Sequence, residues 1–390
     1  MYRFLYLLLF CLPLHAENVL TLPFFNHSNS ANLDWIGESI AESVGDSLAS
    51  EGVLVIDRAT RLEAYSRLEM RPSAEITHAS IIKIGQALDA SVVIYGYYEL
   101  LPPADGDTQS KGSLRVTARL LDLQHTRQGP PFGEVGALED LANLEVHLGW
   151  QVLSFLHPQT APSEDEFVKA RPPVRIDAVE NYIRGLLATA PEQRHRFFTQ
   201  AARLDEHYSQ PCFQLGETYW EKKDYKVAAG WLERVARKDQ HYLRAQFFLG
   251  LCRFYNGDFS GAAQSFQIVA ASVPLNEVFN NLGAAQSRLN EPAQAIASFQ
   301  KASDGDSSDA DYHFNIGYIQ WREGHFDEAV TSLKAALAHK PNDDEATTLL
   351  NRALQREGPR PGDPKLEARE RLKTNYDEAA YRQLQAALAK

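Results

Sequence analysis

Residues 247–266 read FFLGLCRFYNGDFSGAAQSF, and residues 314–333 repeat the same pattern as FNIGYIQWREGHFDEAVTSL. A leucine or isoleucine precedes a glycine, an alanine follows that glycine after twelve residues, and a leucine or phenylalanine follows it after sixteen. The pattern occurs four times, with glycines 34, 33 and 34 residues apart at Gly216, Gly250, Gly283 and Gly317. A period of this length indicates a solenoid of stacked, similar units.

This pattern resembles the tetratricopeptide repeat, which consists of two antiparallel helices over about 34 residues. The resemblance implies that the glycine and the alanine lie where the two helices of one repeat approach closely. We expect four full repeats from about 209 to 342, after a degenerate leading repeat that begins at 177. A capping helix over 343–357 would shield the last apolar face, so the predicted all-α solenoid spans 177–357.

Residues 17–156 alternate between strand-like and helix-like patterns, which predicts an α/β module with a mixed sheet covered by helices. A family likeness is carried by Leu22 to Phe24 with Asn26 and Ser28, by Asp34 to Glu38 with the predicted helix to Leu48, and by Val92 to Gly96. They resemble the N-terminal domain of TolB and its relatives among curli-secretion and flagellar outer-membrane proteins. In TolB a β-propeller follows this domain, whereas here the repeats follow.

The chain has 390 residues, a formal net charge of −12 and 44% hydrophobic residues. An acidic chain lacks the clustered Lys and Arg that phosphate contacts need, so nucleic acid is not an expected partner. Arg3, an apolar run to Leu14 and then Ala16 are typical of a signal peptide over 1–16, which predicts a periplasmic protein. No later stretch is apolar enough to cross a membrane.

Two proline-containing stretches, 157–176 and 358–364, are expected to be linkers. Beyond them, apolar residues at every fourth position predict a C-terminal helix over 365–390. Its apolar face would comprise Leu372, Tyr376, Ala380, Leu384 and Leu388. Cys212 and Cys252 are expected to be buried thiols, because the repeat register separates them too far along neighbouring helices for a disulfide.

Gly45-Asp46-Ser47-Leu48 matches the signature of GDSL hydrolases, and Asp122 stands three residues before His125 as in their second motif. A nucleophilic serine needs a sharp turn after a strand to expose its hydroxyl beside a base. The surrounding pattern instead predicts Ser47 inside an amphipathic helix. A GDSL-type serine hydrolase that uses Ser47 is therefore the alternative, and no catalytic residue is expected in the main interpretation.

The acidic stretch 304–311, DGDSSDAD, resembles a calcium loop. An EF-hand has glycine at its sixth position and a bidentate glutamate at its twelfth, where this chain has Asp309 and Asn315. We expect a solvated turn between repeats. Neither a metal nor a cofactor is predicted, because the sequence contains no paired ligand motif and no phosphate-binding motif.

In the tetratricopeptide family the first helix of each repeat lines a concave groove, and the resemblance assigns the groove residues by their position relative to the glycine. They are Phe213, Trp220, Phe247, Phe254, Tyr255, Asn280, Arg288, Phe314, Tyr318, Trp321 and Arg322. Any single aromatic here has an alternative role in packing the repeats together. As a set they favour binding, because aromatic and arginine side chains dominate interaction hot spots.

The groove is predicted to bind an extended segment of a partner, anchored by Trp321 and Phe314. The amide of Asn280 is expected to clamp the ligand backbone, and Arg288 and Arg322 are expected to favour a carboxylate. The sequence thus predicts a non-enzymatic scaffold of the periplasm or cell envelope that binds protein or peptide partners. A structural subunit of an outer-membrane assembly is an alternative that differs only in the partner.

Overall fold

The computed structural model describes residues 18–28, 30–72, 74–101, 112–360 and 369–388. The predicted signal peptide at 1–16 lies outside the described residues. The chain divides into two compact units, Met1–Pro172 and Pro173–Lys390, and each is described by itself. Among the helices of the described ranges, none combines the length and the apolar character that crossing a bilayer needs.

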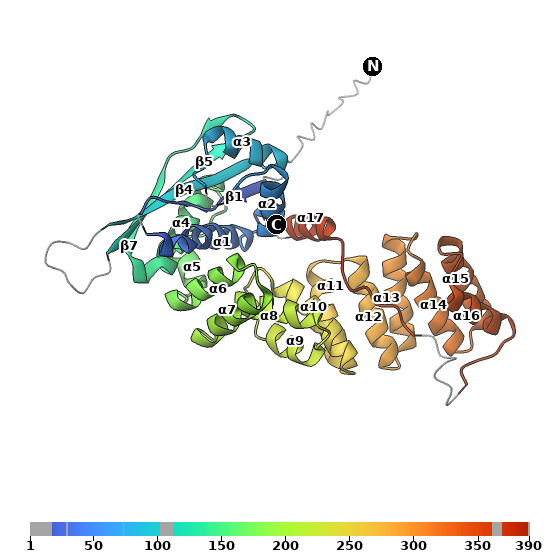
Figure 1. The fold of residues 1–390 in the computed structure, drawn as a ribbon. Coiled ribbons are helices and arrows are strands. Elements are labelled where there is room, and N and C mark those ends of the chain that lie inside the picture. The colour runs from blue at the N-terminus through green and yellow to red at the C-terminus, as the bar shows by residue number, and fades with distance from the viewer. Residues whose placement is uncertain (1–17, 29, 73, 102–111, 361–368, 389–390) are drawn as a thin grey trace, which may run out of the picture. The chain divides into compact units, whose positions relative to one another are not determined.

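The N-terminal unit contains one mixed sheet (Figure 1). Its strands are β1 (Asn18–Thr21), β2 (Phe25–Asn26), β3 (Leu54–Val55), β4 (Val92–Leu101), β5 (Ser113–Asp122), β6 (Arg127–Gln128) and β7 (Phe132–Ala137). The strand order is β3-β1-β4-β5-β6, with β2 beside β4 and β7 beside β5. β1 is parallel to β3 and β4, whereas β5 is antiparallel to β4, with Ile94 opposite Leu120.

Helices cover both faces of this sheet (Figure 1). The helices are α1 (Trp35–Ala49), α2 (Arg58–Arg67), α3 (His78–Ala87) and α4 (Leu141–Leu156), and short 3-10 turns at Ala31–Leu33 and Leu138–Asp140 precede α1 and α4. Leu20 and Val93 of the sheet pack with Tyr65 of α2 and Ile84 of α3 in one buried cluster. α1 and α4 pack against each other and contact the sheet through β1 and β7.

Residues 157–176, predicted to be a linker, contain a helix instead. α5 (Glu164–Ala170) begins with a capping box at Ser163, and Phe167 is 1% exposed. The guanidinium of Arg171 lies 3.6 Å from the centre of the Phe167 ring. Burial of one aromatic ring stabilises a helix at Glu164–Ala170 within the predicted linker. For the exposed residues where the two units divide, the linker stays a prediction.

The C-terminal unit is a run of antiparallel helix pairs. The leading pair is α6 (Ile176–Leu187) with α7 (Pro191–Leu204), and the four repeats are α8 (Ser209–Glu221) with α9 (Tyr225–Leu232), α10 (Tyr242–Tyr255) with α11 (Phe259–Ser272), α12 (Asn276–Arg288) with α13 (Pro292–Gly305), and α14 (Ala310–Arg322) with α15 (Phe326–His339). α16 (Asp344–Leu354) closes the series by packing on α15.

The repeated glycines permit the close approach of the two helices in each repeat. A Cβ atom added to Gly250 would lie 2.7 Å from the ring of Phe266, sixteen residues later. At Gly317 the corresponding distance, to Cγ of Leu333, is also 2.7 Å. The sheet-and-helix unit followed by these helix pairs confirms the predicted fold class.

The C-terminal helix is shorter than predicted. α17 spans only Glu378–Leu388. Residues 369–377 form neither a helix nor a β-strand and run along the repeats (Figure 1). Asp377 starts the helix, because its Oδ1 accepts hydrogen bonds from the main-chain N–H groups of Ala379 and Ala380. Leu372 and Tyr376, which the four-residue spacing assigned to a helix face, precede the helix and contact the repeats instead.

Candidate binding groove of the repeat solenoid

Residues 369–377, called the C-terminal segment below, lie across the first helices of three consecutive repeats. Arg371 contacts α14, Lys373 contacts α12, and Tyr376 contacts α10. The segment therefore runs from the last repeat back toward the second. The surface that it covers, called the repeat groove below, includes Phe247, Asn280, Asn281, Ser287, Phe314 and Asn315.

Two asparagines bind the main chain of the segment at alternate residues. Nδ2 of Asn315 donates to the carbonyl oxygen of Arg371 at 2.9 Å, and Oδ1 of Asn315 accepts from the N–H of Arg371 at 2.8 Å. Asn281 makes the same two bonds to Lys373, both at 2.8 Å. A side-chain amide pairs in this way with any residue except proline, so these contacts require an extended main chain but no particular side chain.

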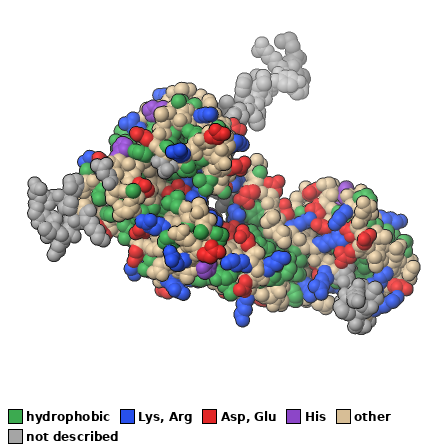
Figure 2. All heavy atoms as spheres, in the orientation of Figure 1, with side chains coloured by type: hydrophobic (Ala, Val, Ile, Leu, Met, Phe, Trp, Pro, Cys, Tyr) green, Lys and Arg blue, Asp and Glu red, His purple; other side chains and the backbone are tan. Residues whose placement is uncertain are grey.

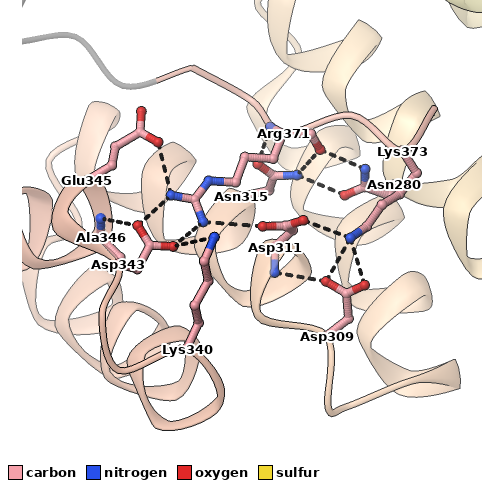
Figure 3. A network of polar contacts seen from close by, with 10 residues as sticks. All are labelled: Asn280, Asp309, Asp311, Asn315, Lys340, Asp343, Glu345, Ala346, Arg371 and Lys373. Carbon is pink, nitrogen blue, oxygen red and sulfur yellow. Dashed lines mark hydrogen bonds and ion pairs between the residues drawn. The ribbon is translucent and has the colours of Figure 1, made fainter.

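Asn280 bonds to the Asn315–Arg371 pair (Figure 3), and its Nδ2 also donates to Oδ1 of Asn281 at 3.3 Å. Its Nδ2 donates to the carbonyl oxygen of Arg371 at 2.8 Å, and its Oδ1 accepts from Asn315 at 2.8 Å. Asn280, Asn281 and Asn315 are all fully buried. An unpaired buried amide costs about 1–3 kcal/mol, so the segment satisfies groups that would otherwise need water or another ligand.

Arg371 is the most heavily bonded side chain of the segment. It forms a bidentate pair with Asp343 at 2.6 and 2.8 Å, and it also reaches Glu345 at 2.9 Å and Asp311 at 3.2 Å. Its guanidinium carbon lies 3.5 Å from the centre of the Phe314 ring. Hydrogen bonds from Arg371 lower the pKa of Asp343 to about 2, which keeps this carboxylate charged.

Lys373 occupies a second acidic site. Its Nζ lies 2.7 Å from both Asp309 and Asp311. Burial opposes the charge of Lys373, but hydrogen bonds to the two carboxylates raise its pKa above the ordinary value. Burial likewise opposes ionisation of Asp311, yet the bond from Lys373 and the charge of Arg371 lower its pKa. Each cation therefore stabilises the acid that binds it.

Glu370 is negatively charged and lies in a basic site of the repeat groove. Its side chain is 2% exposed, and it accepts a hydrogen bond from the hydroxyl of Ser287. Arg288 and Arg322 approach its carboxylate at 3.8 and 3.9 Å. Arg322 also donates to the Ser287 hydroxyl oxygen at 2.9 Å. The two arginines expected to favour a carboxylate thus surround one from the chain itself.

Apolar contacts complete the docking of the segment. Leu372 packs against the buried cluster that includes Phe314. The ring of Tyr376 stands edge-on to Phe247, with the ring centres 4.9 Å apart. Leu372 buries apolar surface between the two cations, and Tyr376 does so beyond Lys373. Hydrophobic burial therefore adds to the hydrogen bonds that hold the segment.

The other predicted groove residues fall into two groups. Trp321 is 1% exposed, donates from its indole N–H to the carbonyl oxygen of Glu357 at 2.6 Å and has Arg352 over its ring. Tyr318 and Phe254 pack in or against the same cluster of the last repeats. These contacts make Trp321 a packing residue under the capping helix, and its role as a ligand anchor stays a prediction.

The second group lies toward the first repeat. Phe213 stacks on His241 with ring centres 4.5 Å apart. Trp220 and Tyr255 belong to an aromatic cluster with Tyr225, in which the rings of Tyr225 and Tyr255 stack at 4.6 Å. The structure therefore does not bring all the predicted residues to one ligand; Phe247, Asn280, Arg288, Phe314 and Arg322 contact the segment.

Sequence reasoning missed several residues that bind the segment. Asn281 and Asn315 follow the predicted groove positions by one residue, at equivalent places in two repeats, and this regularity was an available signal. Asp309 and Asp311, interpreted as part of a solvated turn, bind Lys373. Their role had no local signal, because their partner lies more than sixty residues away in sequence.

Among the residues of the N-terminal unit that the structure describes, Ser47 is not placed at the exposed turn that a serine nucleophile needs. Ser47 lies within α1 and is 4% exposed, and its Cβ and Oγ face the backbone of Gly149 on α4. His125 pairs with Asp122 at 2.8 Å in an exposed turn. Within the described ranges no group of three His, Cys, Asp or Glu side chains is placed to hold a metal ion, and Cys212 and Cys252 are buried free thiols.

The stacked helix pairs and the segment bound across them define the C-terminal unit as a solenoid of a protein-interaction class. A family model for the tetratricopeptide repeat matches residues 213–277 and 280–344. This part of the chain therefore consists of tetratricopeptide repeats.

Solved structures of other repeat proteins are similar to this chain. They include YrrB, described as a tetratricopeptide-repeat protein with an unusual peptide-binding site, at 19% identity, covering 40% of this chain and 82% of YrrB with a TM-score of 0.36. MamA from Desulfovibrio magneticus RS-1 matches at 22% identity over 41% of this chain and 92% of its own, with a TM-score of 0.37. MamA of AMB-1 matches at 23% identity over 42% of this chain and 98% of its own, with a TM-score of 0.37. A comparison with curated proteins gives no match.

Proposed function

We propose that this chain is a non-catalytic scaffold of the periplasm or cell envelope that binds an extended segment of a partner protein in the repeat groove. The observation that carries the proposal is the pairing of Asn315 and Asn281 with the main chain of Arg371 and Lys373. These bonds recognise an extended peptide as such. The C-terminal segment occupies the groove in the way that a partner would.

The chemical character of the chain supports a protein partner over a nucleic acid. The chain is acidic, and acidic and basic side chains are interspersed over the visible face of the C-terminal unit (Figure 2). Tetratricopeptide repeats are generally non-catalytic, and Ser47 is buried in the middle of a helix rather than exposed at a turn. A scaffold accounts for these features without an added catalytic centre.

The proposed location depends on the N-terminal sequence. The signal-peptide pattern of residues 1–16 and the likeness of residues 17–156 to TolB N-terminal domains both support an envelope protein. Cell fractionation with N-terminal sequencing tests this part directly. A mature chain that begins at Glu17 in the envelope fraction is expected, and a cytosolic chain that retains Met1 would contradict it.

Partner capture tests the binding part of the proposal. The full mature chain and a double variant, Asn281→Ala with Asn315→Ala, would be used to retain proteins from the envelope fraction, with Asn351→Ala on the exposed face of α16 as a matched control. A true groove partner is retained by the wild-type chain and the control and lost by the double variant. Equal retention by all three folded proteins would move the binding site away from the repeat groove.

A further inference from the structure

Four consecutive residues of the C-terminal segment each meet a site of matching chemistry. We infer that the repeat groove selects partner segments with the order glutamate, arginine, apolar residue, lysine, and that residues 370–373 are a resident copy of this order, which a partner must displace. The inference rests on the proposed function, since it names the kind of segment that the same groove binds.

The asparagine pairs hold the main chain of a bound segment, and the side-chain sites beside them set its register. They bind the main chain at the positions of Arg371 and Lys373 and leave their side chains to the acidic sites beside them. A segment shifted by one residue would keep the main-chain bonds. It would, however, place each side chain against the site meant for its neighbour, so the order of side chains decides the affinity.

The first position requires an acid. Glu370 is held by Ser287, Arg288 and Arg322 while its side chain is 2% exposed. A cation at this position would lie beside two arginines without access to solvent. Like charges brought together in a desolvated site oppose binding. This position therefore excludes segments that carry a cation here and attracts segments that carry an acid.

The second position favours arginine over lysine. Arg371 uses both Nη atoms on Asp343 and lays its guanidinium plane over Phe314. A lysine ammonium offers neither the planar fork nor the stacking surface, so it cannot reproduce both contacts. The carboxylates of Asp311, Asp343 and Glu345 surround this position, and a neutral side chain would leave their negative charge uncompensated.

The third and fourth positions differ in character. Leu372 packs against the apolar cluster of the last repeats, and Lys373 places its ammonium between Asp309 and Asp311. The lysine site is a pair of carboxylates with a looser ring contact: Nζ of Lys373 lies 5.2 Å from the centre of the Tyr312 ring, whereas the guanidinium carbon of Arg371 lies 3.5 Å from that of Phe314. A compact ammonium suits this site.

The resident copy lowers the apparent affinity for a partner. A ligand that binds only the fraction of chains with an open groove has an apparent Kd equal to its intrinsic Kd divided by that fraction. Weakening the resident segment should therefore strengthen the binding of a peptide that carries the same order. Arg371→Ala with Lys373→Ala removes the two charged contacts of the resident segment and leaves every groove residue unchanged.

Fluorescence anisotropy on the full chain tests the inference. The probe is a labelled peptide with the sequence of residues 368–377, ARERLKTNYD, and the control is ARRELKTNYD, in which the glutamate and arginine are exchanged. The ordered peptide is expected to bind the double variant at least about tenfold more tightly than it binds the wild-type chain, a factor of ten being ~1.4 kcal/mol. The control peptide is expected to bind the variant at least about tenfold more weakly than the ordered peptide does.

The outcomes separate this inference from the proposed function. Equal binding of both peptides would overturn the selection of side-chain order while the groove still bound extended segments. If neither peptide binds, the inference is also wrong, and the capture experiment with the asparagine variants decides the proposed function independently.

If circular dichroism shows that the Arg371→Ala, Lys373→Ala variant misfolds, hydrogen exchange on the unmodified chain replaces the binding experiment. Excess ordered peptide must then speed exchange at the amides of Arg371 and Lys373, and unchanged exchange would contradict displacement.

Discussion

Asn315 is fully buried and uses both the nitrogen and the oxygen of its side-chain amide on the main chain of Arg371. Asn315→Ala removes these bonds and leaves the main-chain N–H of Arg371 without its groove acceptor, while the carbonyl oxygen keeps the hydrogen bond from Asn280. A loss of about 1–2 kcal/mol in docking would raise the open population of the segment about five- to thirtyfold.

Trypsin measures this opening, because Arg371 and Lys373 are both cleavage sites. Cleavage after them should speed up about five- to thirtyfold in Asn315→Ala, since proteolysis follows the population of the open form. Asn351→Ala, on an exposed position of α16, should cleave at the wild-type rate. An unchanged rate in a folded Asn315→Ala chain would show that the asparagine does not hold the segment.

Asp343 gives the docked segment a dependence on acid pH. Its ordinary pKa of 3.8 is lowered to about 2 in the folded chain by hydrogen bonds from Arg371. For a lowered acid pKa, the stabilisation is complete above the unfolded value and is lost as pH falls through the folded value. The contribution of the pair should thus be full above about pH 4 and decline toward about pH 2.

Thermal unfolding followed by circular dichroism between pH 5 and pH 2 measures this decline. Asp343→Asn should lower the melting temperature at pH 5 and flatten its fall at lower pH, because the amide carries no charge at any pH. The wild-type and variant melting temperatures should converge near about pH 2. Curves that stay parallel over the whole range would exclude a role for this carboxylate.

At the scale of the helix pair, the glycines of the repeat are a packing requirement. Gly250 of α10 faces the buried ring of Phe266, whereas Gly230 of α9 has no atom within 4 Å of an added Cβ. Gly250→Ala should lower the free energy of unfolding by about 1–3 kcal/mol through overpacking. Gly230→Ala should raise it by up to ~1 kcal/mol, because alanine favours a helix. Urea unfolding of both variants provides the comparison, and equal effects would contradict the packing account.

The elements that could be predicted from the sequence are those whose cause is local or periodic. Helix pairs recur because the glycine of one helix and the large side chain sixteen residues later form one contact, as for Gly250 and Phe266. The helix α5 and the non-helical course of residues 369–377 depend on distant partners. Leu372 fits a helical spacing equally well, so no local pattern distinguishes the two conformations.

The same distinction applies to the candidate site. Position in a repeat and charge predict that Asn280 faces a main chain and that Arg288 and Arg322 face a carboxylate. The chain's own segment supplies both groups here, so the roles of these residues toward a partner stay predictions. The identity of the bound segment was not predictable. Glu370 lies more than eighty residues from Ser287 in sequence, and nothing in the repeat pattern connects them.

At the scale of the whole molecule, the chain is expected to behave as two units. Residues 172, 173 and 175 are exposed, whereas Phe167 of α5 is buried. Limited digestion with a protease of broad specificity should first cut between residues 171 and 176 and leave two folded fragments. A first cut within Glu164–Ala170, or the absence of any stable fragment, would contradict this division.

The central claim is that partner segments bind where the C-terminal segment lies. A carbodiimide can join Nζ of Lys373 to Asp309 or Asp311, because each carboxylate lies 2.7 Å away, and mass spectrometry identifies the new amide. The cross-link would lock the segment in the groove. Lys373→Arg, treated identically, keeps the positive charge but cannot form the amide cross-link.

Binding of the peptide ARERLKTNYD to the locked chain is the most direct measurement. The locked wild-type chain should lose binding, while the treated Lys373→Arg chain should bind as its untreated form does. Undiminished binding to a chain that is fully cross-linked between Lys373 and these aspartates would contradict the account and place the binding site outside the repeat groove.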